Sequence, residues 1–252
     1  MIEVEFLGTG TSMGVPFVGC ECEVCRSQDP RDKRLRCSAI VRVDGVNLLI
    51  DCGPDFRQQM LRASDNRLDA LLMTHTHYDH SGGMDDLRPY TYHKPFPVYG
   101  RADVLADLRT RMPYSFIDNP YPGVPRFNLH EVDGSIIHFR GIDIEPLPVM
   151  HYKLPIFGYR IGNLAYITDA KTIPSTTMQR LQGVDTLIIN ALRFKPHLSH
   201  FSLEEALEVI KKVSPRRAYL IHMSDGIGLH ASTSRLLPAG VELAYDTEII
   251  RL

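Results

Sequence analysis

Six consecutive residues constrain this chain more than any other feature: His75-Thr76-His77-Tyr78-Asp79-His80, with the pattern H-x-H-x-D-H. Random placement of the 11 histidines and the aspartates would produce this pattern on the order of 10⁻³ times, so chance does not explain it. Imidazole nitrogens and carboxylate oxygens are ligands for divalent ions such as Zn²⁺ and Mn²⁺. Because core packing cannot satisfy four such groups in six residues, the segment predicts a loop that directs them to two neighbouring ions.

The residues around this cluster argue against the alternative, a solvated histidine-rich turn. An apolar stretch, Leu68 to Thr74, has the composition of a buried strand and leads directly into His75. Gly82-Gly83 follows His80 and indicates a turn. The sequence therefore places the cluster at the end of a strand.

Composition excludes several classes of protein. The chain has 252 residues, of which 44% are hydrophobic and 23% charged, so it is not disordered, collagen-like or a coiled coil. A net charge of −2 gives no basic footprint, which disfavours a nucleic-acid binder. No apolar run reaches the ~18 residues of a membrane-spanning helix, and Met1 to Phe6 does not resemble a secretory signal. We expect a cytoplasmic protein without a membrane partner.

The periodicity predicts short, mixed elements within one α/β domain covering residues 1–252. Asp44-Gly45 between two apolar runs predicts a hairpin. Helical spacing covers Arg101 to Met112, and Ser202 with Glu205 forms a capping box for a second helix. The candidate metal-binding residues come just after strand ends, so we expect the site at one edge of a layered sheet structure.

Three of the five cysteines form a second cluster, Cys20-x-Cys22-x-x-Cys25. An odd number of cysteines without a signal peptide does not indicate a disulfide framework. Three thiolates at this spacing suit a soft tetrahedral ion and leave a fourth position open. The alternative is three inert thiols in a reducing compartment. Cys37 and Cys52 have the pattern of small core residues.

The histidine cluster after an apolar strand resembles the signature of the metallo-β-lactamase-fold hydrolases, over essentially the whole chain. That resemblance implies a four-layer αββα sandwich of two mixed sheets, with a dinuclear metal site at one edge. It also implies three further ligands at strand ends, which His151, Asp169 and His222 supply in the required order. The implied ligand sets are His75, His77 and His151 for one ion and Asp79, His80 and His222 for the other, with Asp169 bridging.

The N-terminal segment indicates a branch of this family. Gly8-Thr9-Gly10-Thr11-Ser12-x-Gly14-Val15-Pro16, followed by the cysteine cluster, is similar to the PhnP-like phosphoribosyl 1,2-cyclic phosphate phosphodiesterases of phosphonate metabolism. That branch carries a structural zinc on such cysteines, with a histidine as fourth ligand. This chain has Asp225 at the corresponding position, so either Asp225 or the nearby His230 would complete the site.

The resemblance implies a dinuclear metal-dependent phosphodiesterase that hydrolyses a small, cyclic phosphodiester with a metal-bridging hydroxide. Zn²⁺ and Mn²⁺ both suit the ligands. His200 falls where that branch has its non-ligand active-site histidine, so we expect it to act with Asp79 and Asp169 in catalysis, as general acid or phosphoryl hydrogen-bond donor. A surface histidine before a helix is the alternative for His200.

Other functions of the same fold stay open at this point. A thioesterase or lactonase would use the same ligands on a carbonyl group, and a di-iron redox protein or a non-catalytic metal-binding scaffold are further alternatives. A transfer-RNA nuclease would need an RNA-gripping arm. The Pro- and Tyr-rich region from Arg88 to Pro125 has instead the composition of a rim or lid over a small substrate, or of a homodimer interface.

Overall fold

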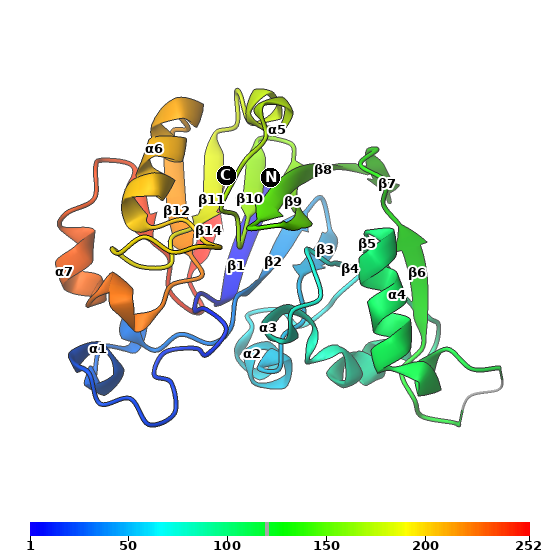
Figure 1. The fold of residues 1–252 in the computed structure, drawn as a ribbon. Coiled ribbons are helices and arrows are strands. Elements are labelled where there is room, and N and C mark those ends of the chain that lie inside the picture. Colours follow the sequence, from blue (N-terminus) through cyan, green and yellow to red (C-terminus); the bar gives the residue numbers. More distant parts are fainter. Residues whose placement is uncertain (119–120) are drawn as a thin grey trace.

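Two seven-stranded sheets form the centre of the computed structural model, which describes residues 1–118 and 121–252 (Figure 1). The first sheet has the order β14-β1-β2-β3-β4-β5-β6 and the second the order β13-β12-β11-β10-β9-β8-β7. The strands of the first sheet are β1 (Ile2–Gly8), β2 (Ser38–Val43), β3 (Val46–Ile50), β4 (Ala70–Leu72), β5 (Phe96–Gly100), β6 (Phe127–Glu131) and β14 (Ile249–Arg251). Those of the second are β7 (Ile137–Phe139), β8 (Ile142–His151), β9 (Leu154–Ile161), β10 (Leu164–Ile167), β11 (Thr186–Asn190), β12 (Arg217–Ile221) and β13 (Val241–Leu243).

Both sheets are mixed. In the first, β14, β1, β2 and β3 pair antiparallel, whereas β3 to β6 pair parallel. In the second, β7 to β10 are antiparallel and β10 to β13 are parallel. The predicted hairpin joins β2 to β3, and its two turn residues Asp44 and Gly45 both have positive φ, 48° and 81°.

Alternation along the strands builds three apolar layers. In β3, Leu48 and Ile50 face the second sheet, whereas Leu49 belongs to the cluster on the opposite face. In β11, Ile188 lies between the sheets and Leu187 packs on the outer side. This period of two gives one core between the sheets and one under the helices on each side, which confirms the αββα sandwich.

The helices cover the two outer faces. Figure 1 shows α4 beside β5 and β6, and α6 beside β11 and β12. The predicted capping box of α6 is present, since the Ser202 hydroxyl accepts from the Glu205 backbone N–H at 3.3 Å and Glu205 accepts from that of Ser202 at 2.8 Å. The helices are α1 (Glu23–Arg26), α2 (Phe56–Arg62), α3 (Tyr78–Ser81), α4 (Ala102–Arg111), α5 (Ser175–Arg180), α6 (Leu203–Val213) and α7 (His230–Ser234).

The sequence patterns do not indicate the short strand β14. This strand forms because Val4 and Ile250 pair across β1 and β14, a contact between the two ends of the chain.

Among the helices in the described ranges, none combines the length and apolar character needed to cross a membrane.

Candidate metal centre

Seven histidine and aspartate side chains from both sheets meet at one edge of the sandwich. Their metal-binding atoms fall into two groups, each with all atoms within 4.8 Å of one another. The groups are His75, His77 and His151, and Asp79, His80, Asp169 and His222. All seven residues implied by the family resemblance are therefore together.

Each residue reaches this edge from the end of an element. His75 and His77 lie between β4 and α3, and α3 itself carries Asp79 and His80. Three strands of the second sheet supply the remaining residues, since His151 is the last residue of β8, Asp169 follows β10 and His222 follows β12. The site is assembled from segments about 150 residues apart because strand ends of both sheets converge at this edge.

Left-handed backbone turns direct three buried carboxylate and imidazole groups into the site. Asp51, Asp169 and His222 have φ of 59°, 56° and 56°, a region that non-glycine residues rarely adopt. Each such residue costs about 1–3 kcal/mol and persists only where the surrounding structure holds it in place. All three are fully buried within two residues of the end of a central strand, so the two sheets hold this strain at the site.

A close approach of two loops positions α3. A Cβ on Gly53 would lie 2.1 Å from the carbonyl oxygen of Asp79, so only glycine fits there. The adjacent Cys52 donates its N–H to the His80 carbonyl at 2.8 Å and accepts from the Gly83 N–H at 2.9 Å. The loop after β3 and the histidine cluster thus form one hydrogen-bonded unit.

Asp51 orients His80 within this unit. Its carboxylate lies 2.7 Å from Nδ1 of His80 and accepts from the N–H and the hydroxyl of Thr74 at 2.8 and 2.7 Å. A carboxylate can only accept, so Nδ1 of His80 carries the proton. With Nδ1 held by Asp51, Nε2 of His80 faces the site, as in the carboxylate–histidine pairs of metal centres.

The donor set fits divalent cations. The Nε2 atoms of His75, His80 and His222 are buried without a hydrogen-bond partner in the described part of the chain. Unpaired buried nitrogens are costly, and here they face two buried carboxylates, Asp79 and Asp169. Lone pairs and carboxylates that converge on one point match what a divalent ion needs.

The pKa shifts show that the carboxylates create a negative electrostatic field at this point. Burial, then the neighbouring His80, lower the pKa of His75 well below its usual range, which keeps this imidazole neutral. Burial would raise the pKa of Asp169, but His222 and His80 outweigh it and hold that pKa well below the ordinary value. Burial opposes a charge on His80, yet Asp169, Asp79 and Asp51 together raise its pKa well above the usual range. The buried carboxylates thus attract positive charge to this point.

His200 lies against residues of both ligand groups. Its Nε2 is 3.0 Å from Oδ1 of Asp169, and its ring centroid is 4.7 Å from that of His151. Burial lowers the pKa of His200 to about 4, although the hydrogen bond to Asp169 acts in the opposite direction. The structure therefore places His200 at the site and not on the open surface.

Sequence reasoning missed three residues that orient the predicted ones. Asp51 holds His80 and accepts from the Thr74 hydroxyl, and the carbonyl of Ser199 lies 2.9 Å from Nδ1 of His151. Asp51 follows an apolar run, so the same rule of polar residues after strand ends would have found it. Ser199 acts through its backbone carbonyl, which leaves no signal in the side-chain pattern.

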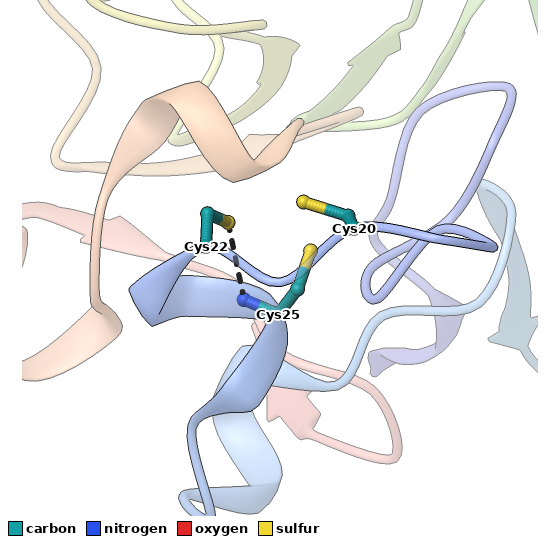
Figure 2. Close-up of side chains that lie close together, drawn as sticks. All are labelled: Cys20, Cys22 and Cys25. Atoms are coloured by element: carbon teal, nitrogen blue, oxygen red, sulfur yellow. Dashed lines mark hydrogen bonds between the residues drawn. The ribbon is translucent and has the colours of Figure 1, made fainter.

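The three clustered cysteines form a separate group on the loop that contains α1. Figure 2 shows their thiols directed toward one another, and the three sulfur atoms lie within 4.8 Å of each other. Sγ of Cys22 caps α1 by accepting from the Cys25 N–H at 3.4 Å. Burial raises the pKa of the Cys25 thiol to about 12, so a nearby cation would be needed to hold it as a thiolate.

The two candidates for a fourth ligand differ in position. Oδ2 of Asp225 lies 3.6 Å from Sγ of Cys22. Nδ1 of His230 lies instead 3.3 Å from Nη2 of Arg34, and the His230 N–H donates to Asp32 at 2.7 Å. Asp225 is therefore the one that lies beside the cysteines.

The Pro- and Tyr-rich region spans the 3₁₀ helix η2 (Met84–Thr91), β5, α4 and the segment leading to β6. Tyr90 and Tyr92 line a cavity of about 510 Å³ between η2 and α2, and Tyr90 donates to the Asn66 carbonyl at 2.6 Å. None of the seven metal-centre residues lines this cavity. Asn119 and Pro120, two of the residues that suggested a rim, lie outside the described residues.

Comparisons with known proteins agree with this geometry. The family described as "Beta-lactamase superfamily domain" matches residues 46–223. A crystal structure titled as a new diphosphatase from the PhnP family is 39% identical, with a TM-score of 0.92, and the match covers 99% of this chain and 96% of that one. A zinc-bound PqqB from Methylobacterium extorquens, at 19% identity and a TM-score of 0.80, covers 99% of this chain and 100% of its own and shows the shared fold alone.

Two curated relatives carry other names. A protein named octanoyltransferase from Porphyromonas gingivalis (strain ATCC BAA-308 / W83) is 45% identical over 95% of this chain, and the chain spans only 49% of the length of that relative. A ribonuclease Z from Mycobacterium sp. (strain KMS) is 26% identical over 98% of this chain and 94% of its own. The match over most of the chain, together with the metal-binding geometry, shows that this protein belongs to the β-lactamase superfamily, in its metallo-β-lactamase fold and close to the PhnP family.

Proposed function

We propose that this protein is a dinuclear metal-dependent phosphodiesterase acting on a small, cyclic phosphodiester. The observation that carries the proposal is the pair of adjacent ligand groups, one of which contains the buried Asp169 that also contacts His200. Relatives named as a diphosphatase and a ribonuclease support phosphate chemistry. The net charge of −2 favours a small substrate over RNA.

The residues of the site would have two roles, metal binding and proton donation. His75, His77 and His151 would hold one ion, Asp79, His80 and His222 the other, and Asp169 would join the two sets. When bound, two Zn²⁺ or Mn²⁺ ions would activate water and neutralise phosphate charge. His200, beside Asp169, would donate a proton to the departing alkoxide or a hydrogen bond to a phosphoryl oxygen.

We also propose that the cysteine cluster binds one structural zinc ion. Cys20, Cys22 and Cys25 present three converging sulfur atoms, and Asp225 supplies the nearest carboxylate. A site with three sulfurs and one oxygen would be closed, and a closed site contributes folding energy rather than catalysis.

The test uses metal-depleted protein reloaded separately with Mn²⁺ and Zn²⁺. The substrates are bis(4-nitrophenyl) phosphate and a 2′,3′-cyclic nucleotide, and Asp169→Ala is the inactive control. We expect metal-dependent turnover of both, reduced at least about 10³-fold in Asp169→Ala because a ligand contributes several kcal/mol to the transition state. Absence of turnover in protein that holds about two catalytic ions per chain would contradict the proposal.

A thioesterase is a second candidate, and the octanoyltransferase relative is the observation that favours it. The same ligands and His200 would act on an octanoyl thioester in place of a phosphodiester. Octanoyl-coenzyme A, assayed beside bis(4-nitrophenyl) phosphate on the same reloaded protein, distinguishes the two. Turnover of the thioester with no turnover of either phosphodiester would establish this alternative.

A further inference from the structure

We propose that Ser199 and His197 are positioning residues that hold the His200 ring in its working orientation. The inference rests on the proposed function, because it concerns how His200 reaches a leaving group. Ser199 Oγ lies 3.0 Å from Nδ1 of His200, and Nδ1 of His197 lies 3.2 Å from the same atom. Nε2, the other nitrogen of His200, faces Asp169.

The loop that carries these residues is closed by its own hydrogen bonds. At its base, the Leu192 N–H donates to the Phe201 carbonyl at 2.9 Å. Within it, the guanidinium of Arg193 donates to the carbonyls of Lys195 and Pro196, both at 3.2 Å. The segment from 193 to 200 therefore presents His197, Ser199 and His200 as one unit at the metal centre.

Hydrogen-bond directions assign Ser199 the central place. The Asp169 carboxylate can only accept, so Nε2 of His200 carries a proton. The backbone N–H of Ser199 donates to Nδ1 of His197 at 3.3 Å, which makes that atom an acceptor. In the neutral His200 ring Nδ1 is then an acceptor, and the single proton of the Ser199 hydroxyl is donated to it at 3.0 Å. His197 restrains the same ring by contact, with the two ring centroids 5.1 Å apart.

Ser199 serves the metal centre and His200 through different atoms. Its backbone carbonyl accepts from His151, whereas its hydroxyl contacts His200. A side-chain substitution keeps the carbonyl and removes only the hydroxyl. Metal binding and the orientation of His200 can therefore be separated by experiment at this one position.

The experiment compares two leaving groups in the reloaded holoenzyme. A 2′,3′-cyclic nucleotide releases a ribose alkoxide that needs a proton, whereas bis(4-nitrophenyl) phosphate releases a phenolate that does not. We expect Ser199→Ala and His197→Ala to lower kcat on the cyclic nucleotide about 10-fold, with KM changed less than about 2-fold. The aryl ester should be cleaved as by the wild type, and Ser199→Thr should restore turnover of the cyclic nucleotide.

The matched control is His138→Ala, which removes an exposed imidazole on the edge strand β7. It should turn over both substrates at the wild-type rate. Equal losses on both substrates, a lowered content of catalytic ions in Ser199→Ala, or no loss on either substrate would each overturn the inference. A wild-type enzyme that cleaves neither phosphodiester would instead refute the proposed function on which it rests.

Discussion

The metal centre and the cysteine cluster are built in opposite ways. The metal centre gathers side chains from residue 75 to residue 222, and both sheets are needed to bring them together. The cysteine cluster comes from residues 20 to 25 on one loop, and two of its three thiols are only half-buried. A site distributed over two sheets depends on the whole fold, whereas a local site depends mainly on its own segment.

The two regions are joined through residues that follow His222. Met223, next to His222, donates its N–H to the Thr9 carbonyl and accepts from the Thr11 N–H, both at 3.0 Å. The chain continues from Thr11 to the cysteines, and Oδ2 of Asp225, three residues after His222, lies 3.6 Å from Sγ of Cys22. Disorder in the cysteine segment could therefore reach His222 through either contact, but neither contact involves a residue of the metal centre itself. The comparison therefore predicts that damage to one region leaves most of the other intact.

Among variants that keep all seven residues of the metal centre, the largest effect is expected from Asp51→Asn. The amide would still accept from the Thr74 N–H, but its NH₂ group would face Nδ1 of His80 and move the imidazole proton to Nε2. That atom would then lack its lone pair. We expect metal affinity or turnover about 10–100-fold below the wild type, measured by metal titration followed by phosphodiester assay.

The control for this variant is Asp143→Asn. Asp143 and His138 form a pair with the same Nδ1–Oδ distance, 2.7 Å, but both side chains are exposed. The control should bind metal and turn over substrate as the wild type does. If Asp51→Asn binds metal and turns over substrate as its control does, then Asp51 does not determine the orientation of His80, and metal binding does not depend on this hydrogen bond.

A smaller effect is expected when the local site is broken by Cys22→Ser. If the proposed structural zinc is bound there, loss of one ligand and of the sulfur that caps α1 should remove one equivalent of zinc and lower the Tm by about 4–8 °C, corresponding to about 2 kcal/mol. Turnover should fall less than about 2-fold, because the metal centre does not draw on this segment. Metal analysis, thermal unfolding and the phosphodiester assay on one preparation supply all three values.

Glu23→Ser is the matched control, since it changes an exposed side chain next to Cys22 and removes no thiol. It should keep the zinc and the Tm. A Cys22→Ser variant that loses activity together with zinc would show that the contacts of Met223 and Asp225 couple the two regions strongly, against the comparison above.

The same contrast explains what can be predicted from the sequence. The H-x-H-x-D-H segment and the cysteine spacing are local, so the order of residues is enough to reveal both. His151, Asp169 and His222 are individually weak signals and are identified through the order that a family resemblance implies. Asp51 can be found by its place after a strand, but no local pattern shows that it contacts His80, 29 residues away, or that the Ser199 carbonyl contacts His151, 48 residues away. The sequence also does not show which of Asp225 and His230 lies beside the cysteines, because His230 is held elsewhere by its contact with Arg34.

The smallest effect is expected at Glu248, which belongs to neither site. Its titration would change the free energy of unfolding with pH and therefore affects how the stability measurements are compared. Glu248 precedes β14, and burial, with Glu242 adding to it, raises the pKa of its carboxyl to about 7. Because this pKa lies above the ordinary value of 4.5, the folded state keeps a proton that the unfolded state loses. The stabilisation is complete below about pH 4.5 and is lost as the pH rises through about 7.

Glu248→Gln should remove this dependence, because an amide resembles the protonated acid at every pH. We expect the variant and the wild type to have equal free energies of unfolding near pH 4.5. By pH 8 the variant should be more stable by about 1 kcal/mol, a value reduced because the side chain is partly open to solvent. Urea unfolding at several pH values measures the difference. If the difference in free energy of unfolding between the variant and the wild type does not change with pH, the pKa of Glu248 is not raised by folding. The loss of Tm in Cys22→Ser could then be compared between pH values without a correction for Glu248.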